Sequence, residues 1–184
     1  MKKNILAFGF LLIAWSVMAQ QADVLIINGK ILDGSGNSWF YGDIAIKNGK
    51  IISIGHLQDY QAIKTIDAKG LTVAPGFIDV HTHIEGDEKK NPTANNFIYD
   101  GVTTVVTGNC GSSEVNLKKY FSALDSIHLS INVATLIGHN DVRRAVMGKA
   151  MRDPSEEEMK KMETIVEQAM KDGAVGFSTG LIYI

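Results

Sequence analysis

The stretch that decides the fold reads PGFIDVHTH and runs from Pro75 to His83. Its apolar and β-branched residues predict a strand over residues 77–83 that ends in two histidines, His81 and His83. Because alternate residues of a strand point to the same side, we expect both imidazoles to face one way. Two neutral imidazoles that converge at a strand end form half of a transition-metal site.

From Pro75 onwards, predicted strands alternate with predicted helices. The later strands are expected over residues 102–107, 131–137 and 174–178, and the helical segments over residues 91–100, 114–127 and 140–172. Strands that alternate with helices form a parallel sheet, either doubly wound or closed into a barrel. The sequence therefore predicts an α/β fold for this part of the chain.

The clearest helix lies towards the end of the 140–172 segment. The pattern Ser155-x-x-Glu158 predicts a capping box at its start, and Gly173 predicts its end. We interpret its apolar stripe as core packing and not as a metal site. The stripe consists of Met159, Met162, Ile165, Val166, Ala169 and Met170.

Residues 22–74 read as short strands joined by turns, which predicts a small β-sandwich-type segment. Asn28-Gly29 and Asn48-Gly49 are both typical of two-residue hairpin turns. We therefore expect two hairpins. The predicted strand pairs are 22–28 with 30–33 and 43–47 with 50–54, and further strands are expected at 65–68 and 71–74.

Residues 1–19 stand apart from the rest. Lys2 and Lys3 precede an apolar stretch from Ile5 to Met18, which is typical of a signal peptide cleaved after Ala19. The run is shorter than the roughly 20 apolar residues of a membrane-spanning helix, which argues against an uncleaved membrane anchor. We therefore expect an exported protein, periplasmic or secreted, with no membrane attachment after cleavage.

Composition and charge are ordinary for a globular protein. The chain has 184 residues, of which 45% are hydrophobic and 21% charged, and its formal net charge is −2. Such a balance gives no reason to expect nucleic acid or an anionic membrane as a partner, and it leaves the oligomeric state open.

The single cysteine, Cys110, is unusual for an exported protein, because cysteines in an oxidising environment usually form pairs. It is either buried and inert or held as a thiolate by a metal. It follows the predicted strand 102–107 in the motif Gly108-Asn109-Cys110-Gly111, whose glycines let the backbone approach a ligand closely.

Four motifs with polar or metal-binding side chains follow the four predicted strands. They are HTH at 81–83, GNCG at 108–111, GHN at 138–140 and STGLIY at 178–183. In a barrel the carboxyl ends of parallel strands share one rim, so we expect these motifs to meet there. A thiolate with imidazoles is typical of zinc, which lowers the pKa of a bound water to about 7. The pattern therefore predicts a hydrolytic metal site, which also needs a carboxylate as general base.

Taken together, these motifs resemble the amidohydrolase superfamily of metal-dependent hydrolases. The stretches GVTTVVTGNCG, GHNDVRRAVMG, PSEEEMKKM and GAVGFSTGLIY are similar to the N-acyl-D-amino-acid deacylases, also called D-aminoacylases, and the similarity runs from about Ala22 to the last residue. The resemblance implies an α/β fold in which residues 22–74 form a small β-sheet segment. Residues 75–184 would form the first four or so β/α units of an incomplete (β/α)8 barrel.

The resemblance also implies an activity and the roles of several residues. The full-length protein would hydrolyse the amide bond of N-acyl-D-amino acids, which are small-molecule substrates, and release a carboxylate and a D-amino acid. D-aminoacylases use a cysteine after the second strand, where many amidohydrolases use a carboxylated lysine. Cys110 would bind a tight zinc ion, His81 and His83 would contribute to a weaker second metal position, and Tyr183 would polarise the substrate carbonyl.

We expect no catalytic role for the remaining histidines or for Asp79. We expect His139 to be structural, since the motif that contains it is not a metal motif of the family. Asp79 is expected to support the end of the first strand by hydrogen bonding. His56 and His128 match nothing in the family and are expected at the surface.

The length predicts that the site is incomplete. Residues 75–184 number 110, whereas a full barrel takes about 250. The resemblance implies that the general-base aspartate and two further zinc histidines lie beyond residue 184, so we expect an N-terminal fragment that is inactive alone. Two alternatives remain open: a cyclic-amide hydrolase of the dihydroorotase or hydantoinase type, and a non-catalytic truncated remnant.

Overall fold

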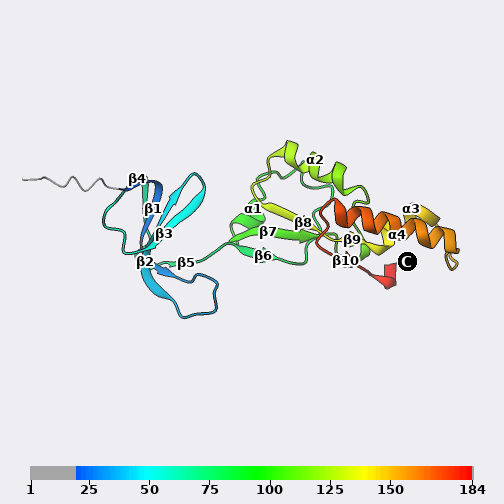
Figure 1. The fold of residues 1–184 in the computed structure, drawn as a ribbon, viewed down its shortest axis with the longest axis horizontal. Coiled ribbons are helices and arrows are strands. Elements are labelled where there is room, and N and C mark those ends of the chain that lie inside the picture. Colours follow the sequence, from blue (N-terminus) through cyan, green and yellow to red (C-terminus); the bar gives the residue numbers. More distant parts are fainter. Residues whose placement is uncertain (1–19, 184) are drawn as a thin grey trace, which may run out of the picture. The chain divides into compact units, whose positions relative to one another are not determined.

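A computed structural model describes residues 20–183, so the predicted signal peptide lies outside the described residues. Within them the chain divides into two compact units, the first ending at Pro75 and the second beginning at Gly76 (Figure 1). Among these residues, no helix has both the length and the apolar character needed to cross a membrane.

The first unit is a five-stranded sheet. Its strands are β1 (Gln20–Ile31), β2 (Phe40–Lys47), β3 (Lys50–Gly55), β4 (Tyr60–Asp67) and β5 (Thr72–Val73). They are arranged in the order β3-β2-β1-β4, and β5 also pairs with β1. The pairs β1–β2 and β2–β3 are antiparallel, whereas β4 and β5 run parallel to β1.

One of the two predicted hairpins is confirmed. β2 and β3 pair in antiparallel fashion up to Lys47 and Lys50, and Asn48-Gly49 forms the two-residue turn between them. Asn48 has φ of 51° and Gly49 has φ of 71°. Positive φ at both central residues is what this turn requires to match the twist of the strands.

The hairpin predicted at Asn28-Gly29 is wrong, because β1 runs straight through this dipeptide to Ile31. Asn28 has φ of 61°, and the pairing with β2 gains one extra residue between Ile26 and Gly29, which is a β-bulge. Beyond the bulge β1 continues, because Lys30 and Ile31 pair with Tyr41 and Phe40 of β2 on one side and with β5 on the other.

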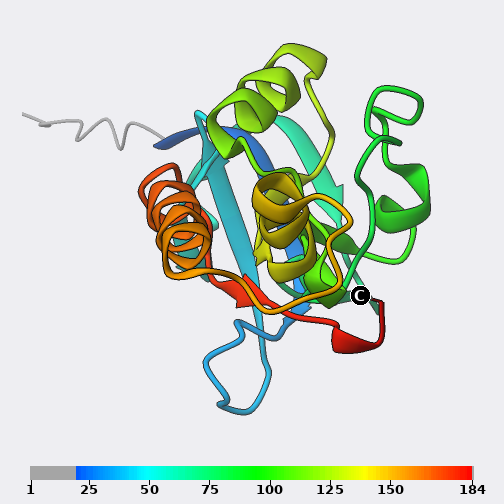
Figure 2. The same ribbon diagram turned by 90° about the vertical axis from the view of Figure 1, so that its right-hand side faces the viewer.

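The second unit consists of parallel strands and helices (Figures 1 and 2). Its strands are β6 (Phe77–Asp79), β7 (Val102–Thr107), β8 (Asn132–Thr135), β9 (Ile137–Gly138) and β10 (Phe177–Ser178). Its helices are α1 (Asn95–Ile98), α2 (Leu117–Ile127), α3 (His139–Met147) and α4 (Glu156–Lys171), with 3₁₀ turns η1 (Asn109–Gly111) and η2 (Leu181–Tyr183). The order β6-β7-β8 and the pair β9–β10 are all parallel, as predicted. The described strands of this unit form two separate open sheets, one of β6, β7 and β8 and one of β9 and β10.

The segment predicted as one helical region, 140–172, contains two helices. α3 ends at Met147, where Gly148 has a positive φ of 60°, and α4 begins after Ser155. The predicted capping box is confirmed, because the Ser155 side chain accepts the Glu158 N–H and the Glu158 side chain accepts the Ser155 N–H.

The larger hydrophobic cluster of the second unit lies between the helices and β9, and a smaller one contains Ala94, Val105 and Ile131. Leu117 of α2, Ile137 of β9 and Val142 of α3 are almost completely buried. In α4, Met162 and Ala169 join this core, whereas Met159 and Met170 are each 45% exposed. The centre of the predicted apolar stripe therefore packs as expected, and its margins face solvent.

Candidate metal centre

The two histidines follow the first strand of the second unit. β6 ends at Asp79, so the prediction that the strand extends to His83 is wrong. The alternation of side chains nevertheless continues, because the Thr82 N–H and hydroxyl both donate to the carbonyl of Val106 at 3.1 and 2.9 Å. Thr82 is buried, while His81 and His83 are exposed. This anchoring of Thr82 gives the two imidazoles their common side.

Asp79 supports the same strand end, as the sequence predicted. Its carboxylate accepts the backbone N–H of His81 at 3.1 Å. The bond closes a short turn directly after β6, and this turn begins the segment that carries both histidines.

Cys110 lies in the tight turn η1, directly after β7. Its φ of 56° falls in the left-handed region, which residues other than glycine seldom adopt. The flanking Gly108 and Gly111 have φ of 76° and 82°. A Cβ at Gly108 would lie 2.2 Å from the carbonyl oxygen of Leu136, and one at Gly111 would lie 2.6 Å from the side-chain oxygen of Asn140. The turn therefore requires glycine on both sides of the cysteine.

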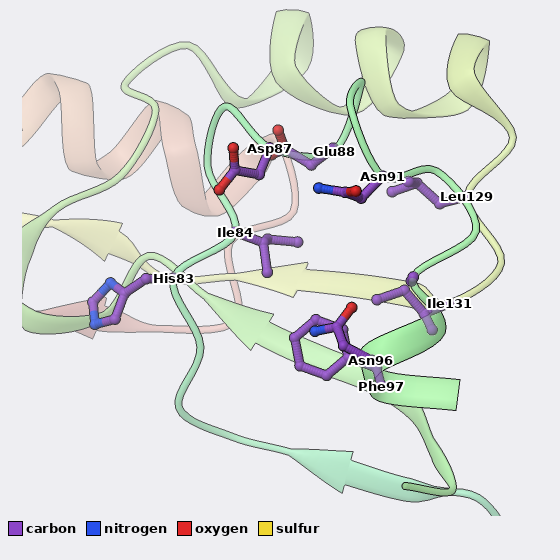
Figure 3. A pocket seen from close by; sticks show the side chains of 10 residues that line it. His83, Ile84, Asp87, Glu88, Asn91, Asn96, Phe97, Leu129 and Ile131 are labelled. Carbon is purple, nitrogen blue, oxygen red and sulfur yellow. The ribbon is translucent and has the colours of Figure 1, made fainter. Parts of the chain in front are cut away.

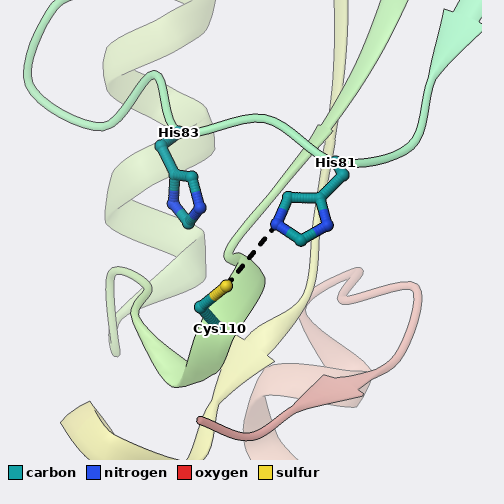
Figure 4. A group of neighbouring side chains, drawn as sticks. All are labelled: His81, His83 and Cys110. Atoms are coloured by element: carbon teal, nitrogen blue, oxygen red, sulfur yellow. Dashed lines mark hydrogen bonds between the residues drawn. The ribbon is translucent and has the colours of Figure 1, made fainter. Parts of the chain in front are cut away.

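The histidine segment and the cysteine turn meet at one place (Figure 4). The ligand atoms of His81, His83 and Cys110 all lie within 4.8 Å of one another. Cys110 Sγ is 3.5 Å from His81 Nε2, and the two imidazole centroids are 5.5 Å apart.

Both the identity and the spacing of these donors fit zinc. Two imidazole nitrogens and one sulfur are donor types that zinc prefers, and zinc binds them at about 2.0–2.3 Å. Cys110 is half-buried and both histidines are exposed, so the group is open to an incoming ion. No carboxylate of residues 20–183 belongs to this group of ligand atoms.

The four predicted motifs come together around this group. The Ser178 hydroxyl of β10 accepts the Gly111 N–H at 3.0 Å and donates to the Gly108 carbonyl. His139, at the start of α3, lies outside the donor group, and its Nδ1 is 3.2 Å from the Thr179 hydroxyl. The ends of β7, β9 and β10 are thus joined by hydrogen bonds.

Two residues near the centre were not singled out by sequence reasoning. Glu85 accepts the Thr107 hydroxyl at 2.5 Å and the Gly108 N–H at 2.6 Å. Asn140 is 2% exposed and donates to the carbonyls of Gly180 and Cys110 at 3.2 and 3.4 Å. Glu85 stands at the start of the charged run EGDEKK, where nothing in the sequence distinguishes it, while the motif GHN at least included Asn140.

A pocket of about 400 Å³ lies beside the metal centre and has His83 at one end (Figure 3). Its lining combines apolar side chains with several polar ones: Ile84, Asp87, Glu88, Asn91, Ala94, Asn96, Phe97, Leu129 and Ile131. Glu88 is buried and accepts the Tyr120 hydroxyl at 2.7 Å. Burial, together with the neighbouring Glu88 carboxylate, raises the pKa of Tyr120 far above its ordinary value.

The other predicted residues fall outside the donor group. The backbone of Tyr183 lies in η2, but its side chain is outside the described part of the structure, so its role stays a prediction. His56 and His128 are exposed, as expected.

Comparisons with known proteins show which family this chain resembles. The sequence model of the amidohydrolase family matches residues 64–183. A D-aminoacylase from Alcaligenes xylosoxydans xylosoxydans is 35% identical over 90% of this chain and 39% of its own length. The chain therefore spans about two fifths of the length of this curated relative.

Solved structures of D-amino-acid deacylases are also similar to this chain. An N-acyl-D-glutamate deacylase from Bordetella bronchiseptica, complexed with zinc and a phosphonate inhibitor, has a TM-score of 0.84 at 36% identity, over 88% of this chain and 39% of that chain. A D-aminoacylase described as having a binuclear metal centre has a TM-score of 0.83 at 31% identity, over 89% of this chain and 39% of that chain. With the family's sequence model matching well over half of its residues, the chain belongs to the amidohydrolase family.

Proposed function

We propose that this chain forms part of a zinc-dependent enzyme that hydrolyses the amide bond of N-acyl-D-amino acids to a carboxylate and a free D-amino acid. The observation that carries the proposal is the convergence of Cys110 with His81 and His83. The similarity to a D-aminoacylase and an N-acyl-D-glutamate deacylase supports this substrate class.

The three donors have distinct proposed roles. Cys110 would hold a tightly bound zinc ion, and His81 and His83 would contribute to a weaker second metal position. Bound zinc polarises a carbonyl and supplies a nucleophilic water near neutral pH. The chain keeps the donors ready for the ion, since Thr82 holds both imidazoles on the open side and the turn from Gly108 to Gly111 presents the thiol.

Further parts of the site belong to the proposal. Tyr183 would donate a hydrogen bond to the substrate carbonyl and so favour attack on its carbon. A hydrolytic site also needs a general base, and no carboxylate of residues 20–183 joins the donor group. The resemblance to the D-aminoacylases implies that the base is an aspartate outside these residues, and on that ground we propose that the 184-residue chain alone does not catalyse the reaction. We also propose that residues 1–19 direct export to the periplasm or the medium.

The metal site is tested by zinc analysis of the purified chain after equilibrium dialysis. We expect stoichiometric zinc in the wild type and its loss in Cys110→Ala. The control is His56→Ala, which removes an exposed histidine outside the donor group and should bind as the wild type does. Zinc content that is unchanged in Cys110→Ala would refute the proposed site, and absence of zinc from the wild type would favour a non-catalytic remnant.

The substrate class is tested by measuring amino acid release from N-acyl-D-amino and N-acyl-L-amino acids and, in parallel, the ring opening of hydantoins and dihydroorotate, which releases no free amino acid. The 184-residue chain and any longer product of the same reading frame are compared. We expect release from the D-compounds by the longer product only. Zinc-dependent deacylation by the 184-residue chain would refute its proposed inactivity, and turnover of the cyclic amides alone would favour the dihydroorotase or hydantoinase alternative.

A further inference from the structure

A single hydroxyl holds both flanks of the turn that carries Cys110. Ser178 Oγ accepts the Gly111 N–H at 3.0 Å on one side of the cysteine. On the other side, the same hydroxyl donates to the Gly108 carbonyl. Ser178 is 67 residues from Gly111 and 70 from Gly108 in the chain, so this contact exists only in the folded unit.

The turn depends on such support, because its conformation is unfavourable for cysteine. With φ of 56° and ψ of 25°, Cys110 adopts the left-handed region. A residue other than glycine keeps this conformation only where its surroundings impose it. Within the turn, the Ser112 N–H donates to the Asn109 carbonyl at 3.0 Å, and this bond spans the cysteine without fixing Gly108.

Two other side chains contact the same turn. Glu85 accepts the Gly108 N–H at 2.6 Å, and the Asn140 amide donates to the Cys110 carbonyl at 3.4 Å. Of the three side chains, only Ser178 bonds to both flanking glycines, at 3.0 Å and 2.5 Å. Ser178 also lies on β10, which pairs in parallel with Ile137 and Gly138 of β9. The pairing with β9 therefore fixes the position from which the Ser178 hydroxyl reaches the turn.

We propose that Ser178 is a positioning residue for the metal thiolate. By fixing the main chain on both sides of Cys110, its hydroxyl sets the direction of Sγ towards His81 and His83, and hence the strength of the sulfur–metal bond. Groups that orient a metal ligand without touching the ion commonly contribute 10–100-fold to metal affinity. This inference rests on the metal site of the proposed function.

The test uses cobalt(II) alone as the probe, titrated into the full chain. A thiolate–cobalt charge-transfer absorption reports directly on the sulfur–metal bond. We expect Ser178→Ala to weaken cobalt binding by about 10–100-fold and to reduce this absorption at saturation. Thr179→Ala, which removes the neighbouring hydroxyl that faces His139, should bind cobalt as the wild type does.

A matched pair separates positioning from folding. Ser178→Thr keeps a hydroxyl and Ser178→Val lacks it, while both are β-branched and of similar size. We expect the threonine variant to restore binding and absorption, and the valine variant to behave like Ser178→Ala. Equal cobalt affinities for these two variants would overturn the inference, even if Ser178→Ala failed to fold. If the wild type itself showed no thiolate–cobalt absorption, the proposed metal site would fail instead.

Discussion

Replacement of Gly108 by alanine should destabilise the second unit strongly. At φ of 76°, a residue with a Cβ costs about 1–2 kcal/mol. The added Cβ would also lie 2.2 Å from the Leu136 carbonyl oxygen and 2.7 Å from Thr135 Oγ1. Because the main chain must shift to relieve this overlap, we add the cost of overpacking, about 1–3 kcal/mol. We therefore expect Gly108→Ala to lower the free energy of unfolding by about 2–5 kcal/mol.

Gly86→Ala is the matched control, because Gly86 lies in the same unit with φ of 88° and a Cβ there would meet nothing within 4 Å. It should cost only the conformational part, about 1–2 kcal/mol. Urea unfolding followed by far-ultraviolet circular dichroism measures both variants, since the helices of the described residues all lie in the second unit. Equal losses in the two variants would refute the argument that close approach to Leu136 requires glycine at position 108.

Two further predictions concern packing and pH. Ile137 is fully buried, so Ile137→Ala should lower the free energy of unfolding by about 2–5 kcal/mol in the same urea assay. Met151 is 87% exposed, so the control Met151→Ala should change it by less than about 0.5 kcal/mol. Similar losses in both variants would contradict this assignment of the core. The Arg152 guanidinium and the Ser155 N–H hold the pKa of Glu158 at about 2, against an ordinary value of 4.5. Because the folded-state pKa is the lower one, this stabilisation is complete above pH 4.5 and is lost as pH falls through 2. The difference in melting temperature between wild type and Glu158→Gln should therefore shrink over this range, and a difference independent of pH would count against the contact.

Elements with a strong local cause were predicted well from the sequence. The strand at Val102–Thr107, the turn at Asn48-Gly49 and the capping box that begins at Ser155 all appear where they were expected. Their causes act over a few residues: β-branched side chains, backbone conformations open to asparagine and glycine, and a side chain that satisfies free N–H groups at a helix start.

Asn28-Gly29 shows where local reasoning fails. The same dipeptide that turns the chain at residues 48–49 forms a bulge inside β1 at residues 28–29. Both asparagines have positive φ, whereas of the two glycines Gly49 has a positive φ and Gly29 does not. The outcome differs because the residues after Gly29 do not fold back on β1 but pair with β2 on one side and, on the other, with Thr72 and Val73, more than 40 positions later in the chain. A preference for positive φ therefore predicts an irregularity, but distant strand partners decide its form.

For the candidate metal centre, too, some features could be predicted from the sequence and others could not. The types and positions of His81, His83 and Cys110 in the sequence were enough to nominate the donors, because few other residues bind zinc and each follows a strand. The sequence could not show that Glu85 and Ser178 hold the cysteine turn, since a glutamate in a charged run and a serine after a strand are common.

The sequence by itself thus determined which atoms are available to a metal, and the tertiary structure decided how closely they meet. The physical reason is that donor chemistry belongs to single residues. The separation of the donors depends instead on hydrogen bonds between segments far apart in the chain, such as those from Thr82 to Val106 and from Ser178 to Gly108.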